Sequence, residues 1–114
     1  ISFMHAYANS VHEKEVGELI KRELPHCYLT LSSELIPKAG LYERTSTTVL
    51  NSYVGPIIKR YLSRLTTKLR EHNFQGTLLI MQSNGGVTSP QIAMEQAANT
   101  LLSGPRTAFS TLWV

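Results

Sequence analysis

Residues 78–81 are four consecutive apolar residues, followed at once by polar residues and two glycines. An apolar run this short is typical of a strand buried on both faces. Open α/β sheets bind ligands at the carboxyl ends of their strands, so this interpretation places Asn84, Gly85 and Gly86 in a ligand-facing loop. The alternative, which spacing alone favours, is a strand followed by a tight turn at the glycines.

Two more strands are predicted near the start of the chain, at residues 3–7 and 28–31, which are rich in apolar and aromatic side chains. Between them Ser10 and Glu13 have the spacing of a capping box, which predicts a helix beginning at Ser10. Apolar residues continue at helical spacing, and Pro25 ends the helix at or before Leu24. Strand, helix and strand together predict a βαβ unit with parallel strands.

A long helical region is predicted over residues 42–72, with a kink or a break at Gly55–Pro56. Ser89 and Pro90 begin a shorter helix that runs to about Ala98. We expect the strands at 3–7, 28–31 and 78–81 to share one sheet covered by helices, an α/β layered architecture. The face of the long helix opposite its apolar stripe is basic, and we interpret it as solvated rather than as a nucleic-acid surface; its residues are Lys59, Arg60, Arg64, Lys68 and Arg70.

Composition limits the function further. A chain of 114 residues with 42% hydrophobic residues indicates at most one globular domain, and no apolar run approaches the length of a membrane span. The single Cys27 fits a reducing cytoplasm and is interpreted as a small buried hydrophobe rather than a nucleophile. Every acidic residue is a glutamate, whereas phosphoryl-transfer sites commonly hold magnesium through an aspartate. In a nucleotide enzyme that ligand would therefore come from outside this chain.

Several blocks of residues, in order along nearly the whole chain, resemble the hydantoinase A/oxoprolinase family. These are His5–Asn9 with His12–Glu13, Tyr42–Thr48, Asn51, Tyr53–Pro56, Met81–Gly86 and Thr100–Pro105. The resemblance implies that residues 1–114 are a single fragment of an actin-like ATPase domain, a ribonuclease H-like layered sheet with flanking helices. It also implies ATP and Mg²⁺ as cofactors and an activity that opens a cyclic amide or carboxylates a ketone.

The same resemblance assigns cofactor binding to Asn84, Gly85, Gly86, Ser103 and Gly104, and identifies no catalytic residue and no metal ligand. After Pro105 the chain departs from the family pattern, because residues 106–114 contain no glycine. We therefore expect that the chain alone does not bind ATP or Mg²⁺.

Individual polar residues of these blocks have alternative roles. His5 and His12 have acid–base or metal-binding capacity, although a structural role is favoured for each. Glu13 is accounted for by the capping box. Arg44 either orients an anion or pairs with Glu43 or Glu34.

Three functions stay open at this point. The favoured one is a fragment of an ATP-dependent cyclic amide hydrolase that is inactive alone; the others are a non-catalytic binding or assembly module and, with only charge in its favour, a nucleic-acid-associated domain. The expected partners are a small cyclic amide, the remaining segments or subunits of the parent enzyme, and further copies of this chain joined through an edge strand or the tail at Trp113–Val114. No membrane partner is expected.

Overall fold

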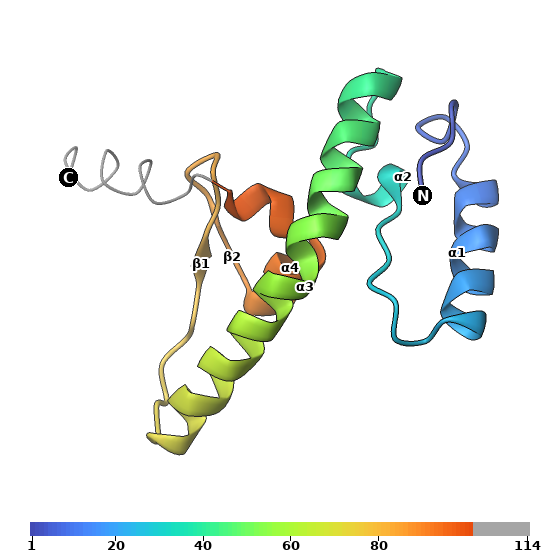
Figure 1. Cartoon of the computed structure of the whole chain (residues 1–114). Coiled ribbons are helices and arrows are strands. Elements are labelled where there is room, and N and C mark those ends of the chain that lie inside the picture. Colours follow the sequence, from blue (N-terminus) through green and yellow to red (C-terminus); the bar gives the residue numbers. More distant parts are fainter. Residues whose placement is uncertain (102–114) are drawn as a thin grey trace. The chain divides into compact units, whose positions relative to one another are not determined.

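The computed structural model describes residues 1–101. These contain the helices α1 (Val11–Glu23), α2 (Ser32–Leu35), α3 (Leu41–Glu71) and α4 (Pro90–Glu95), the strands β1 (Ile80–Met81) and β2 (Val87–Thr88), and the 3₁₀ helix η1 (Ala97–Thr100) (Figure 1). The chain divides into two compact units, Ile1–Tyr53 and the part from Val54 onward, which are described separately below. The described fold is thus a mixture of helices with a small two-stranded sheet.

The first unit holds α1, α2 and the beginning of α3. Helix α1 begins after Ser10 and ends before Leu24, as the sequence predicts. Its buried face carries Glu13 and Gly17. A methyl group on Gly17 would lie 3.1 Å from a methyl carbon of Leu31, so this glycine allows α1 to pack closely on residues 29–31.

The predicted strand at residues 3–7 is wrong, because residues 4–8 form turns. Side chains take the backbone groups that a strand would need: the Phe3 N–H donates to Glu13, and Arg44 donates to the carbonyls of Phe3 and Met4. The turn is closed by N–H groups of Ala8 and Asn9, which donate to the His5 carbonyl. A strand requires those groups to pair with a neighbouring strand.

The predicted strand at residues 28–31 is also absent, although part of its expected pairing is present. The amino group of Ile1 donates to the Thr30 carbonyl at 2.7 Å, and the Ser32 N–H donates to the Ile1 carbonyl at 3.0 Å. Two such bonds on either side of Leu31 are the pattern of a parallel pair. One pair of residues is too little to form a ladder, so the βαβ unit does not form within residues 1–53.

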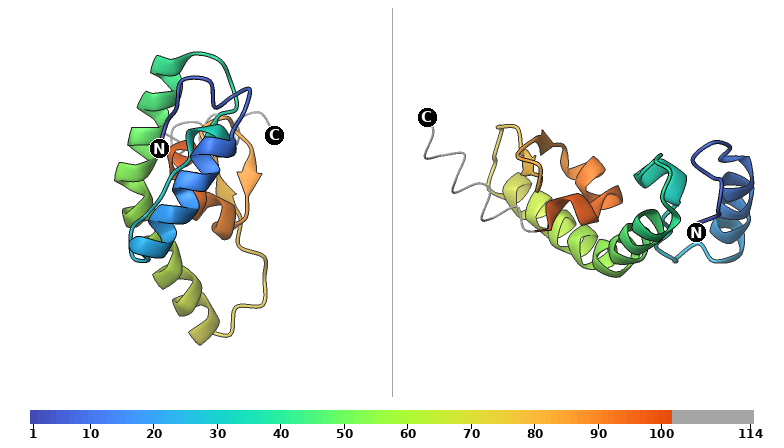
Figure 2. Two further views of the ribbon diagram at one scale, coloured as in Figure 1. Left: turned by 90° about the vertical axis from the view of Figure 1, so that its right-hand side faces the viewer. Right: turned by 90° about the horizontal axis from the view of Figure 1, so that it is seen from above.

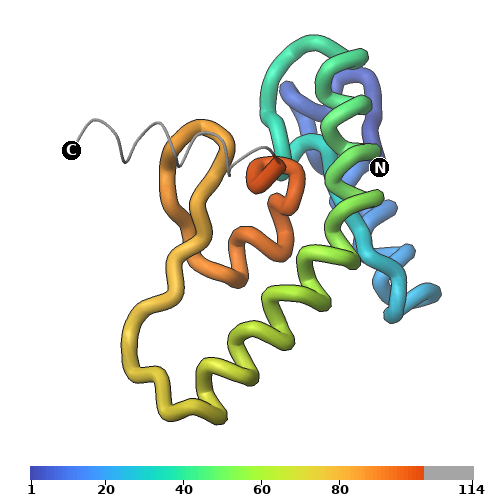
Figure 3. Tube along the Cα trace, turned by 60° about the vertical axis from the view of Figure 1, so that its left-hand side comes forward, coloured from blue at the N-terminus to red at the C-terminus, as the bar shows by residue number. Residues whose placement is uncertain are grey.

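The second unit contains the rest of α3, a hairpin and two short helical segments. Helix α3 runs as one element through Gly55–Pro56 (Figure 3). Of the two predicted alternatives, the break into two helices is therefore wrong, and the kink stays a prediction. Pro56 lies inside this helix and has no N–H to donate to the Ser52 carbonyl. Of the predicted apolar stripe, Leu62 is buried, while Tyr61 is 61% exposed.

The apolar run at 78–81 becomes a short hairpin strand rather than a strand buried on both faces. Only Ile80 and Met81 are in β1, which pairs antiparallel with β2 in the register Ile80 to Thr88 and Met81 to Val87. Leu79 is 54% exposed. Figure 2 shows the two strands side by side, with α4 and η1 following them along the chain. The prediction of one sheet built from residues 3–7, 28–31 and 78–81 is therefore wrong.

The start of the last helix is predicted correctly. Ser89 is the N-cap of α4, its hydroxyl accepts the N–H of Ile92, and Pro90 is the first helical residue. The helix ends at Glu95, and η1 takes over from Ala97. Cys27 is exposed, which corrects its interpretation as a buried hydrophobe.

Candidate functional site

The first unit has a polar interior. Its buried polar or charged side chains are Glu13, Thr30, Ser32, Arg44, Thr48 and Asn51, whereas its buried apolar ones are only Ala6 and Leu31. Glu13, Ser32 and Arg44 are fully buried and bonded to one another in a chain, and we call these three residues the polar hub. Burial of so many polar groups requires that each find a partner.

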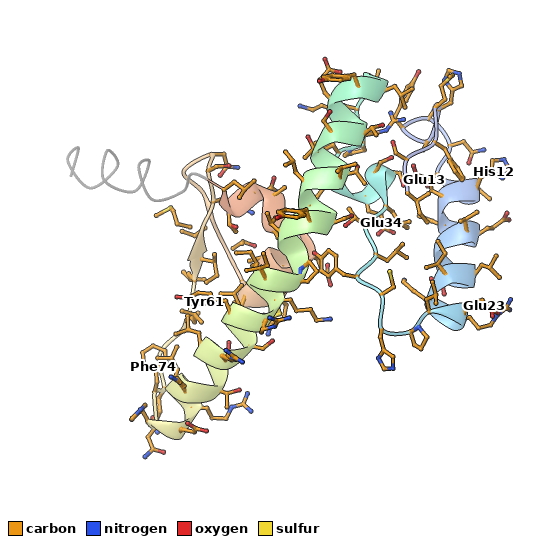
Figure 4. The ribbon with its side chains drawn as sticks, in the orientation of Figure 1. His12, Glu13, Glu23, Glu34, Tyr61 and Phe74 are labelled. Atoms are coloured by element: carbon orange, nitrogen blue, oxygen red, sulfur yellow. The ribbon has the colours of Figure 1, made fainter. Side chains whose placement is uncertain are left out.

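Glu13 accepts three hydrogen bonds, one from the N-terminal segment and two from the start of α2. They come from the Phe3 N–H at 2.8 Å, the Ser32 hydroxyl at 2.6 Å and the Ser33 N–H at 2.9 Å. Figure 4 shows Glu13 on the side of α1 that faces α2, while His12 points away from it. The predicted capping box is wrong, since the side chain of Ser10 makes no capping bond and the N–H of Val11 instead donates to Asn9.

The surroundings of Glu13 favour its charged form. Burial alone raises the pKa of the carboxyl, but the hydrogen bonds from the Ser32 hydroxyl and the N–H groups of Ser33 and Phe3 outweigh it. The pKa of Glu13 consequently lies below its usual value.

Arg44 joins the hub to the N-terminal turn. Its Nε donates to the Ser32 hydroxyl at 3.1 Å and its Nη1 to the Lys38 carbonyl at 3.0 Å. Its Nη2 donates to the carbonyls of Phe3 and Met4. These bonds engage four of the five N–H groups that a guanidinium offers. The predictions that Arg44 pairs with Glu34 or Glu43, or orients an anion, are therefore not supported by its geometry.

The next turns of α3 extend this polar contact surface. The Thr48 hydroxyl donates to the Arg44 carbonyl at 2.7 Å, and the Asn51 amide donates to the Thr30 hydroxyl at 3.1 Å. Sequence reasoning missed Thr30, Ser32 and the inward direction of Asn51. A signal was present, because Arg44, Thr48 and Asn51 recur at helical spacing on one face.

The N-terminal turn presents two exposed rings above the hub. His5 is exposed and Tyr7 is 43% exposed, and their ring centroids are 6.2 Å apart. The guanidinium carbon of Arg44 lies 5.6 Å from the centroid of the Tyr7 ring, within the range of a cation–π contact. The second predicted histidine, His12, is exposed on α1 and lies 3.9 Å from Glu15, apart from the hub.

The second candidate site is the hairpin loop of the second unit, residues 82–86. The N–H groups of Gln82 and Ser83 donate to the carbonyls of Gly86 and Asn99 at 2.8 and 2.7 Å. The Gly85 N–H donates to the Gln82 carbonyl at 3.0 Å, and the Gly86 N–H to the Asn84 side-chain oxygen at 2.8 Å. Gly85 has a φ of +88°, which is the left-handed conformation that favours glycine.

This loop is a poor phosphate cradle, because the backbone N–H groups of Gln82, Ser83, Gly85 and Gly86 are already engaged within the hairpin and with η1. Asn84, Gly85 and Gly86 are exposed, and a side chain added at Gly85 would meet nothing within 4 Å. The loop therefore offers the Asn84 amide group and an open glycine surface to a ligand. Ser103 and Gly104, the other predicted cofactor residues, lie outside the described residues, as do Trp113 and Val114.

Residues 1–101 contain no group of three His, Cys, Asp or Glu side chains able to hold a metal ion. Within the same residues no helix combines the length and the apolar character needed to cross a bilayer.

The predicted basic face of α3 is exposed. A surface groove of about 470 Å³ lies along it, lined by Ser63, Arg64, Thr67, Lys68 and Glu71. The Thr67 hydroxyl donates to the Ser63 carbonyl, and the Glu71 carboxylate opposes the two cations. These features fit a solvated helix face better than a nucleic-acid surface.

Comparison with known proteins gives consistent matches. The sequence profile of the hydantoinase/oxoprolinase family matches residues 44–111. An uncharacterized protein of Methanocaldococcus jannaschii is 40% identical over 105 residues, which cover 92% of this chain and 15% of that protein. Caprolactamase subunit alpha of Pseudomonas jessenii is 34% identical over 95% of this chain and 16% of its own length.

A 5-oxoprolinase of Saccharomyces cerevisiae is 33% identical over 92% of this chain and 8% of its own length. The chain thus spans less than a fifth of each of these relatives. No solved structure matches it significantly.

Proposed function

This chain belongs to the hydantoinase/oxoprolinase family, and we propose that it is one segment of an ATP-dependent enzyme that opens cyclic amides. The observation that carries the proposal is the extent of the matches, because relatives named for caprolactam and 5-oxoproline align with more than nine-tenths of the chain. Both named compounds are lactams. A cyclic amide is therefore the substrate class that the named relatives support.

Within such an enzyme we assign the hairpin loop a ligand contact. The Asn84 amide and the open surface at Gly85 would contact ATP, together with Ser103 and Gly104. ATP, when bound, supplies the phosphoryl group and the free energy for opening the amide. Four backbone N–H groups of the loop are already engaged, and residues 1–101 contain no group of three metal-ligating side chains. We therefore assign the binding of the phosphates and of Mg²⁺ to other parts of the enzyme.

It follows that the 114-residue chain does not hydrolyse ATP alone. Phosphoryl transfer depends on positioning the phosphates and neutralising their charge, commonly with a metal held by an acidic side chain. Incubating the purified chain with ATP and Mg²⁺ should release phosphate no faster than buffer. Saturable release by the pure chain would refute the assignment of those groups to other segments.

The positive test is a chimera in which this chain replaces the matched segment of the caprolactamase alpha subunit. We expect the chimera to retain ATP-dependent caprolactam hydrolysis. Asn84→Ala should lower kcat/KM about tenfold, the factor that corresponds to 1.4 kcal/mol of lost transition-state stabilisation. Lys59→Ala, an exposed change on α3, is the matched control. A folded chimera whose activity is indifferent to Asn84→Ala would count against the ligand contact.

An assembly role is the second candidate, and exposed apolar side chains favour it. Tyr42 is 81% exposed and Tyr53 75% exposed, and Met4 is 63% exposed. Exposed apolar area of this kind commonly marks an interface. We propose that the isolated chain self-associates. Light scattering at several concentrations should show a mass above 12.7 kDa, whereas a monomer at every concentration would contradict the proposal.

A further inference from the structure

The turn at residues 3–9 has an unusually well-fixed backbone. The Phe3 N–H donates to Glu13, and the carbonyls of Phe3 and Met4 accept from Arg44. The His5 carbonyl accepts from the N–H groups of Ala8 and Asn9 at 3.0 and 3.1 Å. Ala6, in the middle of the turn, is 3% exposed and anchors it to the interior. A short segment at the surface is thus held by two fully buried charged side chains.

In contrast to the fixed backbone, two side chains of this turn extend into solvent. His5 and Tyr7 flank the buried Ala6 and are both exposed. Among residues 1–101 neither the imidazole nor the phenol makes a hydrogen bond; the two rings lie 6.2 Å apart, and the Arg44 guanidinium lies 5.6 Å from the Tyr7 ring. The fixed backbone sets where each side chain begins, which is one part of the preorganisation that a binding site needs, and it leaves the polar atoms of both rings open to a ligand. Burial of Glu13 and Arg44 is costly, and precise positioning is one use of such groups.

We propose that His5 and Tyr7 form a recognition site for the amide group of a small cyclic amide. The proposal rests on the function proposed above and adds the residues that would contact the substrate. A neutral imidazole has one N–H donor and one acceptor nitrogen, and a phenol O–H is both donor and acceptor. A lactam presents a carbonyl acceptor beside an N–H donor, so one lactam satisfies both side chains.

The charges around the turn favour a neutral group over an anion. The Arg44 guanidinium lies 5.6 Å from the centroid of the Tyr7 ring, but four of its N–H groups donate to Ser32, Lys38, Phe3 and Met4. The guanidinium therefore supports the ring from below without offering a bidentate contact. A metal ion is not favoured either, because no group of three ligating side chains exists in the described residues.

The test is a titration of the isotope-labelled 114-residue chain with ε-caprolactam, followed by NMR at the histidine and tyrosine ring positions. Small polar molecules bind such sites with dissociation constants on the order of millimolar. We expect saturable shifts at His5 and Tyr7. His12, an exposed imidazole on α1, is the internal control and should not respond. Cyclohexanone, which has a carbonyl but no N–H, should bind more weakly, and acetate should not bind.

Variants separate the two side chains from the rest of the turn. Tyr7→Phe should weaken caprolactam binding about two- to tenfold, the value of one net hydrogen bond. His5→Ala should remove the response of the Tyr7 ring. Met4→Ala, an exposed change on the same turn, should leave it intact. Equal shifts at His5 and His12, no saturable response, or binding unchanged in both ring variants would each overturn the proposal.

Failure of this site is distinguishable from failure of the proposed function. Caprolactam shifts confined to residues 82–86 would move substrate recognition to the hairpin and leave the cyclic amide class intact. Loss of lactam hydrolysis in a folded chimera would refute the function whether or not the isolated chain binds caprolactam at His5.

Discussion

Replacing Glu13 tests whether the polar hub holds the first unit together. In Glu13→Gln one oxygen is retained, and it still accepts from the Phe3 N–H and the Ser32 hydroxyl, which both donate to Oε1. The new amide group takes the place of Oε2, which accepts the Ser33 N–H. Two donors then face each other at a buried position, and the negative charge is lost.

The expected cost follows from those contacts. A buried donor left without an acceptor costs about 1–3 kcal/mol, and hydrogen bonds to a charged group are worth about 1.5–3 kcal/mol. Glu13→Gln should therefore lower the free energy of unfolding by about 2–4 kcal/mol. Glu13→Ala, which leaves all three donors without their acceptor, should cost more than Glu13→Gln, about 3–5 kcal/mol.

The pH dependence has a definite sign. The pKa of Glu13 is lowered in the folded protein, so its contribution to stability is fully present above the unfolded pKa of about 4.3. That contribution is lost as the pH falls through the lower, folded pKa. The wild type should lose stability in this acid range, and Glu13→Gln should lack that component of the loss.

Urea unfolding followed by far-UV circular dichroism at a series of pH values measures both effects. Glu15→Gln is the matched control, since it lies on the same helix with an exposed carboxylate. Its unfolding midpoint should stay within the scatter of surface changes, about 0.5 kcal/mol. If Glu13→Gln and Glu15→Gln shift the midpoint equally, or follow the same pH profile, the buried hub is not a source of stability.

Two further changes test the helix termini and the packing of α1. Ser89→Ala should cost about 0.5–1 kcal/mol because the Ser89 hydroxyl caps α4, while Ser10→Ala should change the unfolding midpoint little, since Ser10 makes no capping bond. Urea midpoints of the two variants check this. A larger loss of unfolding free energy in Ser10→Ala than in Ser89→Ala would support the capping box after all. Gly17→Val should cost about 1–3 kcal/mol by overpacking against Leu31, and a stabilised variant in the same assay would contradict the close contact.

Helices α1 and α3 and the start of α4 were predictable from the sequence because their signals are local, whereas α2 lies in a stretch that was interpreted as a connection. Pro25 and the apolar spacing after Ser10 located α1, and Ser89–Pro90 located the start of α4. The strands were not predictable in the same way. An apolar run indicates a preference for extended backbone, but a strand forms only where a second strand is available to pair with it. Next to the predicted strand at 28–31, Ile1 bonds only Thr30 and Ser32, and the run at 78–81 keeps a two-residue strand paired with β2.

The candidate site was harder to predict than the helices, because its supporting residues look unremarkable one at a time. Ser32 and Thr30 are short hydroxyl residues in a loop, and neither carries a motif of its own. Arg44, Thr48 and Asn51 do share a helical face, but a pattern method that seeks apolar stripes treats a polar stripe as solvent-facing.

The structure shows that this polar stripe is the buried face of the first part of α3, and that Tyr42, Val49 and Tyr53 are exposed instead. In the first unit the usual relation between polarity and burial is therefore inverted along α3. Buried charged groups are costly compared with apolar packing, but their hydrogen bonds fix direction, because hydrogen bonds constrain angles as well as distances. What Glu13 and Arg44 fix is the backbone of residues 3–5, and with it the two rings that this turn presents. The polarity of the interior and the exposure of His5 and Tyr7 thus have one physical explanation.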